Sequence, residues 1–234
     1  MALTVTEYAI PGTGADLTLA VVADLHNRRG EETAARVLAL SPDACLFVGD
    51  LFEAPPRRRR FAVGEAARCR EILAPHCTLF WSRGNHDYTL PPELADTMTR
   101  LGVHRLEDDF MPFRGILLGG LTSVYYRAGH TPDLAFLDRF AAAPGYRLLL
   151  SHHPEYYDPY LRDRHFDLTV SGHAHGGQWR LFGRGVYAPG QGLFPRYTSG
   201  FYDDGHLLVS RGVKPSLLPR FGNPREILLL RLSV

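Results

Sequence analysis

Five short apolar segments of this 234-residue chain are each closed by Asp, Asn or His. The segments are VVADLH (21–26), LFVGD (46–50), LFWSRGNHD (79–87), LLLSHH (148–153) and LTVSGHAH (168–175). Apolar runs of this length predict buried β-strands. Because ligands bind at the C-terminal edge of the strands in an open α/β sheet, the five segments predict one polar rim. Any interpretation of the chain has to account for all five together.

The segments between these strands carry helical patterns, which predicts an α/β protein. The expected helices are residues 31–40, 61–73, 92–101 and 131–143. Beyond residue 180, turn-rich loops and two late strands (205–212 and 225–232) indicate antiparallel additions rather than further strand–helix–strand units. No linker, repeat or low-complexity block divides the sequence, so we expect a single domain over residues 1–234.

Composition excludes several classes of protein. With 45% hydrophobic and 22% charged residues, the chain is neither disordered nor collagen-like. No apolar run approaches the ~18 residues of a membrane span, and residues 1–14 lack the basic start and apolar middle of a signal peptide. We therefore expect a cytoplasmic protein with no transmembrane segment. A net charge of +1 gives no electrostatic reason to predict a stable nucleic-acid partner.

Each polar residue of the rim has an ordinary explanation when it is taken alone. Asp24 can start a turn, Asp50 can cap a helix and Asn85 can occupy a turn. A lone buried histidine is more often a satisfied core residue than a ligand. The conjunction is far more specific, because D-x-H, G-D, G-N-H-D, a strand-terminal His and G-H-x-H occur in that order, always after an apolar run.

This ordered set of motifs resembles the signature of the calcineurin-like metallophosphoesterases. The similarity is closer to the bacterial branch typified by the YkuE- and YaeI-like phosphodiesterases, on the blocks GHAHGGQW (172–179), YAPGQGLFPRYTSGFY (187–202), LLVSRG (207–212) and FGNPREILLLRL (221–232). The resemblance spans the chain from Asp24 to the C-terminus. It implies a four-layer α/β/β/α sandwich, in which two mixed β-sheets are flanked by helices.

The resemblance also implies a dinuclear metal centre. One ion would be held by Asp24, His26, Asp50 and His175, and the second by Asp50, Asn85, His152 and His173, with Asp50 as the bridge. A shell of carboxylate, imidazole and amide oxygen suits manganese, iron or zinc better than calcium or magnesium. Two divalent ions outweigh two carboxylates and a bridging hydroxide, which leaves positive charge for a phosphate.

His86 and Asp87, in the G-N-H-D motif, are expected to be catalytic residues rather than ligands. By the resemblance, His86 protonates the leaving group or donates to an oxygen of the substrate, while Asp87 orients His86 and raises its basicity. The alternative is that His86 packs in a loop.

Three further residues are candidate substrate contacts. Arg28 and Arg29 follow His26 and could bind phosphate oxygens, and His153 follows His152, although its side chain on a strand would point to the opposite face. The basic run PPRRRR (55–60) is either a solvated face or a grip for an anionic headgroup, a nucleotide or RNA. The aromatic loop GLFPRYTSGFY (192–202) either packs over the sheet or contacts an acyl chain or base at the mouth of the pocket.

The resemblance thus implies a metal-dependent phosphoesterase that hydrolyses a phosphodiester or pyrophosphate bond with a bridging hydroxide nucleophile. The substrate would be a phosphate-ester small molecule, a nucleotide or a lipid headgroup, and a lipid substrate would place the protein at the periphery of a membrane. Two alternatives stay open. One is a dinuclear metallohydrolase of another ester or amide, and the other is a non-catalytic interaction module on the same fold.

Overall fold

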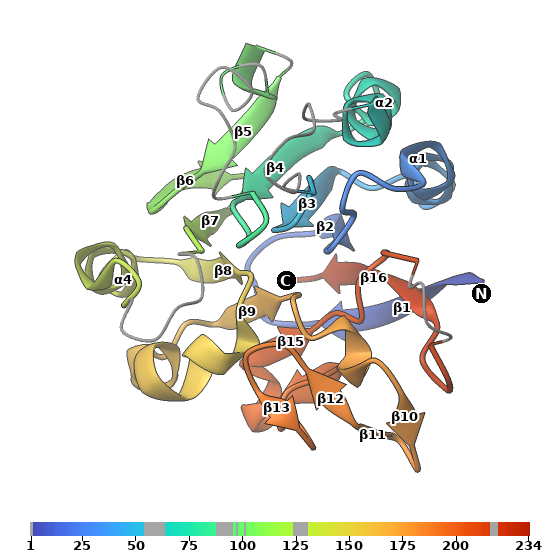
Figure 1. Ribbon diagram of the computed structural model, residues 1–234. Helices are drawn as coiled ribbons and strands as arrows, with labels where there is room; N and C mark the ends of the chain where they lie inside the picture. The colour runs from blue at the N-terminus through green and yellow to red at the C-terminus, as the bar shows by residue number, and fades with distance from the viewer. Residues whose placement is uncertain are drawn as a thin grey trace.

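The computed structural model describes residues 2–53, 64–87, 96, 98–100, 102–123, 131–215 and 220–234. Two six-stranded sheets and two small hairpins make up its β-structure (Figure 1). The first sheet has the strand order β1 (Leu3–Ile10), β16 (Arg225–Leu232), β2 (Leu17–Val22), β3 (Ala44–Val48), β4 (Thr78–Ser82) and β5 (Val103–Leu106). The second has the order β14 (Gly200–Tyr202), β15 (Leu207–Val209), β9 (Leu168–Ser171), β8 (Tyr146–Ser151), β7 (Ile116–Leu121) and β6 (Asp109–Phe113).

Both sheets are mixed. In the first, β2, β3, β4 and β5 are parallel neighbours, whereas β16 runs antiparallel to β2. In the second, β7, β8, β9 and β15 are parallel, and β6 and β14 are antiparallel edge strands. The parallel strands point their C-terminal ends the same way within each sheet. Each sheet therefore presents an edge where ligands can be gathered.

Side chains of successive residues on the buried strands point to opposite faces of each sheet, and this produces the layers of the fold. In β2, Leu19 and Val21 face the core between the two sheets, while Ala20 and Val22 face the helices on the outer side. Helices α1 (Gly30–Leu38) and α2 (Gly64–Leu73) cover the outer face of the first sheet. Helix α4 (Leu134–Ala141) covers the outer face of the second (Figure 1). The predicted four-layer α/β/β/α sandwich is confirmed, because side chains of successive residues on a strand point to opposite faces and bury both.

The helices differ from their expected bounds at the ends. Helix α2 begins at Gly64, and residues 61–63 of the expected helix lie outside the described residues. Most of the helix expected at 92–101 also lies outside them. Helix α4 is shorter than the expected 131–143, because the side chain of Asp133 caps it by accepting a hydrogen bond from the Phe136 amide (2.9 Å).

One of the two late strands differs from the expected antiparallel pairing. As expected, β16 adds antiparallel to β2, but β15 pairs parallel with β9 and only its other neighbour, β14, is antiparallel. Strand β1 was not anticipated, and it pairs in parallel with β16 along its whole length. Its alternation of half-buried and exposed residues is weak, because an edge strand buries little of its surface.

Two short hairpins project from the end of the second sheet. They are β10 (Arg180–Leu181) with β11 (Arg184–Gly185), and β12 (Tyr187–Ala188) with β13 (Gly192–Leu193). They follow the turn of helix at His175–Gly177, so they start where the G-H-x-H motif ends (Figure 1).

Candidate metal centre

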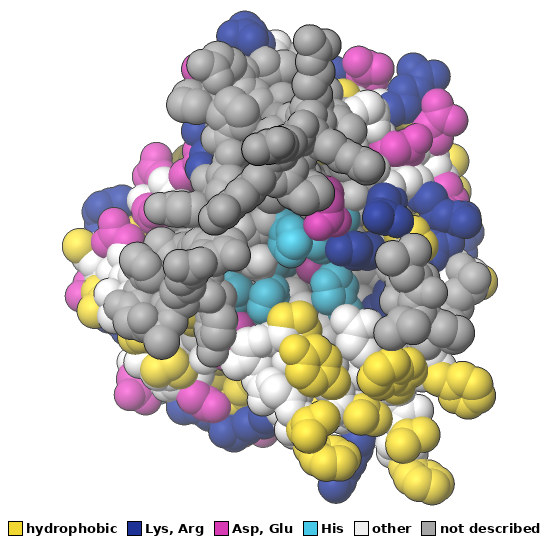
Figure 2. Space-filling model, in the orientation of Figure 1, with side chains coloured by type: hydrophobic (Ala, Val, Ile, Leu, Met, Phe, Trp, Pro, Cys, Tyr) yellow, Lys and Arg dark blue, Asp and Glu magenta, His cyan; other side chains and the backbone are white. Residues whose placement is uncertain are grey.

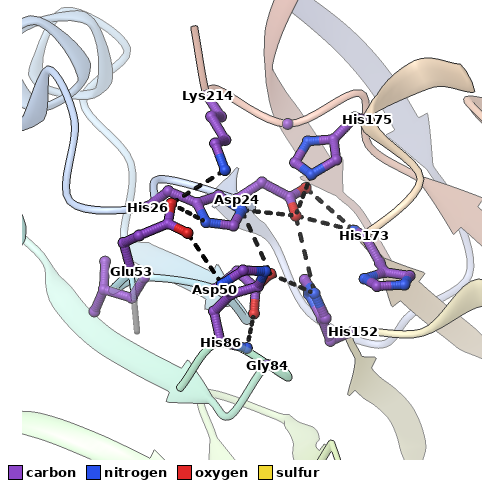
Figure 3. Close-up of polar contacts among 12 residues, drawn as sticks. Asp24, His26, Asp50, Glu53, Gly84, His86, His152, His173, His175 and Lys214 are labelled. Carbon is purple, nitrogen blue, oxygen red and sulfur yellow. Dashed lines mark hydrogen bonds and ion pairs between the residues drawn. The ribbon is translucent and has the colours of Figure 1, made fainter. Parts of the chain in front are cut away.

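The predicted ligands follow five strands and meet at one place between the sheets (Figure 3). Asp24 and His26 follow β2, Asp50 follows β3 and Asn85 follows β4. His152 follows β8, and His173 and His175 follow β9. Asp24, His26, Asp50 and His152 are at most 1% exposed, and His173 is 5% exposed. Buried charges require a partner or a metal, so this concentration of polar groups calls for one.

The backbone at this rim is strained. Asp24, His26, Asp50, His173 and His175 all have positive φ angles, between 47° and 63°. The left-handed conformation costs a non-glycine residue about 1–2 kcal/mol. Such strain clusters at functional sites, where the surrounding fold holds it in place. Here the strained turn is what swings each side chain from the end of its strand toward the others.

Four sets of potential ligating atoms occur in the described residues, and two of them consist entirely of predicted ligands, while the other two are His26, Glu53 and His86, and His153, Glu155 and His173. The ligating atoms of Asp24, His26 and His175 lie within 4.8 Å of one another, and so do those of Asp50, His152 and His173. Asp50 Oδ2 lies 3.4 Å from His26 Nε2 and 3.3 Å from His152 Nε2, so this oxygen stands between the groups. These two groups contain six of the seven residues that the family resemblance implies as ligands, and Asn85 is the seventh.

Several polar atoms at the centre are buried without a hydrogen bond to any described residue. They are Nε2 of His26, His152 and His173, and Oδ1 of Asn85. An unsatisfied buried polar atom costs about 1–3 kcal/mol. The second nitrogen of His152, Nδ1, is 2.9 Å from the Val48 carbonyl, which it can approach only as a donor, so Nε2 carries the free lone pair. Inward lone pairs of imidazole and amide beside carboxylates are the donor set of a transition-metal site, and the residues present fit one.

Glycines allow the ligands to approach each other. A Cβ on Gly49 would lie 2.3 Å from Nδ1 of His152, and one on Gly84 would lie 2.2 Å from the Asp50 amide nitrogen. Gly49 also has a φ of +73°. No larger residue fits either position without moving a ligand, which explains the glycine of the G-D and G-N-H-D motifs.

Burial and neighbouring charges set the protonation of the centre. Burial raises the pKa of Asp24 and lowers the pKa values of His173 and His175, which keeps these imidazoles neutral. Burial also opposes ionisation of Asp50, but His152 and His26 hold the pKa of this carboxyl well below its usual range. Despite burial, Asp50 and Asp24 raise the pKa of His152 to about 10. A metal ion would take the place of that proton.

The side-chain contact of the candidate catalytic histidine is with Glu53, and Asp87 contacts the backbone instead. Glu53 Oε1 is 3.2 Å from His86 Nδ1, and Glu53 Oε2 is 3.0 Å from His26 Nδ1 and 3.1 Å from Lys214 Nζ (Figure 3). The carboxylate of Asp87 is fully buried and accepts from the backbone amides of Gly84 (2.9 Å) and Phe52 (2.9 Å). Asp87 therefore shapes the loop that carries His86, whereas Glu53 orients its ring.

The burial of Asp87 has an electrostatic consequence. Desolvation and the nearby charge of Asp50 raise the pKa of Asp87 to about 7. Asp87 accepts backbone amides from two chain segments, one at Phe52 and one at Gly84, and these segments also shield its carboxylate from solvent. The sequence could not distinguish this backbone role from contact with His86, since Asp87 directly follows His86 along the chain.

Of the three candidate substrate contacts, two are exposed and one is buried beside a predicted ligand. Arg28 and Arg29 are exposed, and Arg29 pairs with Glu32 (3.2 Å). His153 is fully buried, with Nδ1 2.9 Å from Glu155 Oε1 and its ring centroid 4.2 Å from that of His173. It therefore lies behind a ligand instead of in contact with solvent. The run 55–60 lies outside the described residues.

Sequence reasoning missed a supporting layer of residues. Glu155 Oε1 lies 3.6 Å from His173 Nε2 and also contacts His153. The carbonyl of His175 accepts from Arg220 Nη2 (2.8 Å) and from Asn223 Nδ2 (2.8 Å). Asn223 stands in FGNPRE, part of a block that carried the resemblance, so a signal for it existed. Glu53 and Glu155 had no such signal, because each follows a motif closely and only the fold turns its side chain inward. Glu53 lies in a loop and Glu155 in the 3-10 turn Pro154–Tyr156.

Comparison with known proteins agrees with this geometry. A family model described as calcineurin-like phosphoesterase matches residues 17–177. An uncharacterized metallophosphoesterase of Campylobacter jejuni is 30% identical over 249 residues, which cover 97% of this chain and 62% of that protein. The chain thus spans about three fifths of the length of that relative. YpbG, an uncharacterized protein of Bacillus subtilis, is 24% identical over 92% of this chain and 81% of its own length.

Solved structures with some likeness include TT1561 of Thermus thermophilus, at 14% identity and a TM-score of 0.48, covering 67% of this chain and 81% of that one. A metallophosphoesterase from Sphaerobacter thermophilus is 14% identical with a TM-score of 0.33, over 68% of this chain and 61% of that one.

This chain belongs to the calcineurin-like phosphoesterase family, since the family match covers more than half of it. The described residues supply several groups that could hold a metal. None of the helices in the described ranges has the length and apolar character to cross a membrane.

Proposed function

We propose that this protein hydrolyses a phosphodiester or pyrophosphate bond with two metal ions. Asp24, His26, Asp50 and His175 would hold one ion, and Asp50, Asn85, His152 and His173 the other. The observation that carries the proposal is the place of Asp50 Oδ2, 3.4 Å from an imidazole of one ligand group and 3.3 Å from an imidazole of the other. One oxygen shared by two sets of donors is the arrangement that a bridging ligand needs.

The donor set favours manganese, iron or zinc, because imidazole and amide groups stand beside only two carboxylates. Bound ions of this kind supply Lewis acidity at the phosphoryl oxygens and activate water for attack on phosphorus. The chain contributes the fixed positions of the donors, which the buried strand ends and the strained turns hold before any substrate arrives.

His86 is placed to give a proton to the leaving oxygen. Its side chain is 36% exposed, Nδ1 faces Glu53, and Nε2 lies 4.0 Å from Asp50 Oδ2, which turns it toward the centre. Burial lowers the pKa of His86, but contact with Glu53 and the charge of Asp50 more than offset this, so the pKa is raised. A raised pKa favours the protonated form of His86, which is the form that a general acid needs.

Hydrolysis of bis(p-nitrophenyl) phosphate with added manganese tests the proposal, with p-nitrophenyl phosphate as the monoester comparison. We expect diester turnover and about two metal ions per chain, as the ligand sets require. His152→Ala should lose the metals and the turnover, whereas His206→Ala, whose ring faces the Phe166 carbonyl away from the centre, should keep both. Purified protein that holds no metal and cleaves neither ester would favour the non-catalytic module.

Membership in the YkuE- and YaeI-like branch and a cytoplasmic location are parts of the same proposal. Two observations support the branch. The blocks that resemble it lie mostly beyond residue 177, where the family match ends, and one of them supplies Asn223, which holds the His175 carbonyl.

A hydrolase of carboxylic esters or amides would be favoured if such a substrate were cleaved faster than the diester.

A further inference from the structure

Large hydrophobic side chains gather on the hairpins beside the metal centre and are exposed there. We call this group the hairpin surface, and its members are Trp179, Leu181, Phe182, Tyr187, Leu193, Phe194 and Phe221. Phe182 is 105% exposed, Phe194 79%, Phe221 72% and Leu193 71%. Elsewhere in the part of the chain that the structure describes, the exposed large hydrophobics are Leu134, Phe201 and Val234. Clustering of this kind marks an interaction site, since scattered single residues are the ordinary case.

The backbone conformation indicates that two of these side chains do not stabilise the fold. Phe182 and Phe194 have φ angles of 49° and 51°. A bulky residue in this region is an outlier, and glycine or asparagine would occupy the same turn at lower cost. Both phenylalanines are therefore strained and solvated at once, so neither the turn nor the core accounts for them.

The charge of this region has one sign. Residues 168–202 contain Arg180, Arg184 and Arg196 but no Asp or Glu, in a chain with 25 acidic residues. Arg196 pairs with Asp158 (2.9 Å), whereas no carboxylate among the described residues pairs with Arg180 or Arg184. Those two side chains and Arg196 line a cavity of about 460 Å³ together with Phe194, Phe201 and Tyr202. Guanidinium groups beside exposed aromatic rings fit an anionic group that carries apolar chains.

The hairpin surface and the metal centre share one face of the molecule. Figure 2 shows the histidine side chains at the middle of this face and the hydrophobic group directly beside them. The link is covalent and short, because the helical turn that contains ligand candidate His175 runs into β10. The guanidinium of Arg180 donates to the carbonyl of Gly176 in that turn (3.1 Å).

We propose that the hairpin surface docks on a lipid bilayer that contains anionic lipids. Phe182, Leu193 and Phe194 enter the interface, Trp179 and Tyr187 lie at the level of the headgroups, and Arg184 meets lipid phosphates. Single side chains that project from turns suit a fluid surface, which needs no matching shape, better than a second copy of the chain. Docking sets the metal centre against the membrane surface and thus selects phosphate esters of membrane lipids, a step that rests on the proposed function.

Vesicle binding tests the docking. The chain is mixed with phosphatidylcholine vesicles or with vesicles that also contain phosphatidylglycerol, and binding is followed by co-sedimentation and by tryptophan emission. The chain has two tryptophans, and Trp81 is fully buried, so a blue shift reports on Trp179. We expect the shift with anionic vesicles, a weaker response at high salt, and no shift in Trp179→Phe.

Two variants locate the contact. Phe182→Ser with Phe194→Ser should weaken binding about tenfold or more, since each buried phenylalanine contributes enough for a tenfold change. Arg184→Ala should weaken binding to anionic vesicles only. Matched controls are Leu134→Ser on α4 and Arg36→Ala on α1, both exposed and away from the hairpins, and they should bind as the unaltered chain does.

The outcomes separate the proposals. Failure to bind either vesicle, equal binding by the double phenylalanine variant, or a dimer that this variant abolishes without any vesicle binding would each overturn docking. Turnover of soluble bis(p-nitrophenyl) phosphate should be unchanged in the double variant. Diester cleavage without vesicle binding would support the proposed function and contradict docking. Vesicle binding without cleavage would support docking and contradict the proposed function.

Discussion

The metal centre and the hairpin surface depart from the usual distribution of side chains in opposite ways. At the centre, Asp24, Asp50 and the three ligand candidates His26, His152 and His173 lie inside the molecule, where charged and polar groups are costly. On the hairpins, Phe182 and Phe194 lie outside, where apolar groups gain nothing. Both regions also hold non-glycine residues in left-handed turns. Buried charges, exposed phenylalanines and left-handed turns all reduce the stability of the fold. Their presence at the metal centre and on the hairpin surface is best explained by the ligand that each region binds.

Among variants that leave the metal ligands in place, His86→Ala should give the largest effect, because it removes the proton donor. We expect turnover of a diester to fall by about 10²–10⁴-fold with unchanged metal content. Steady-state kinetics and metal analysis on the same preparation measure both quantities. Unchanged turnover would remove His86 from the mechanism.

Glu53→Gln should reduce turnover less, by roughly 10–100-fold, since Glu53 acts through His86 and His26. The pH profile gives a sharper test. Contact with Glu53 raises the pKa of His86, so protonated His86 persists to higher pH in the unaltered chain. Its loss should move the alkaline limb of the rate profile to lower pH. Glu71→Gln, on the exposed side of α2, is the control, and an unmoved limb in the Glu53 variant would refute the positioning role.

Asp24→Asn tests whether the buried charge is kept for the metal at the expense of folding. Burial raises the pKa of Asp24, which means that its ionised form destabilises the metal-free fold. Asparagine accepts the same amide of His173 and tolerates the left-handed backbone. We expect a metal-free melting temperature no lower than that of the unaltered chain, at about 2–4 °C for each kcal/mol relieved, and a smaller rise on adding manganese, because the ligands of only one ion are impaired. A clear fall in the metal-free melting temperature would contradict this.

Phe182→Ser should have the smallest effect on folding. Because Phe182 is fully exposed, its replacement should change the free energy of unfolding by no more than about 0.5 kcal/mol. Phe47→Ala in buried strand β3 is the comparison and should cost about 3–5 kcal/mol. Urea denaturation measures both. A large loss in the Phe182 variant would show that the hairpin surface stabilises the fold, and the contrast between the two regions would disappear.

Much of the fold could be predicted because its signal is local. Runs such as LFVGD and LLLSHH are buried strands, and the polar residue after each one marks the same edge of a sheet. Strand β1 was not predicted, because its pattern of buried and exposed residues is weak. The parallel pairing of β15 with β9 was not predicted either, because the sequence of one strand does not specify which strand lies beside it. Pairing depends on how distant segments pack, and a short strand such as Leu207–Val209 carries too few residues to specify it.

For the metal centre, the sequence by itself determined the ligand candidates, since residue type and position after a strand suffice to name Asp24, Asp50 and the histidines. Only the tertiary structure decided which carboxylate serves His86. Asp87 is adjacent in sequence, yet it is turned to the backbone amides of Gly84 and Phe52, while Glu53 reaches the ring from another loop. The physical reason is that hydrogen bonds form between groups that folding brings within about 3 Å, and distance along the chain does not measure that separation.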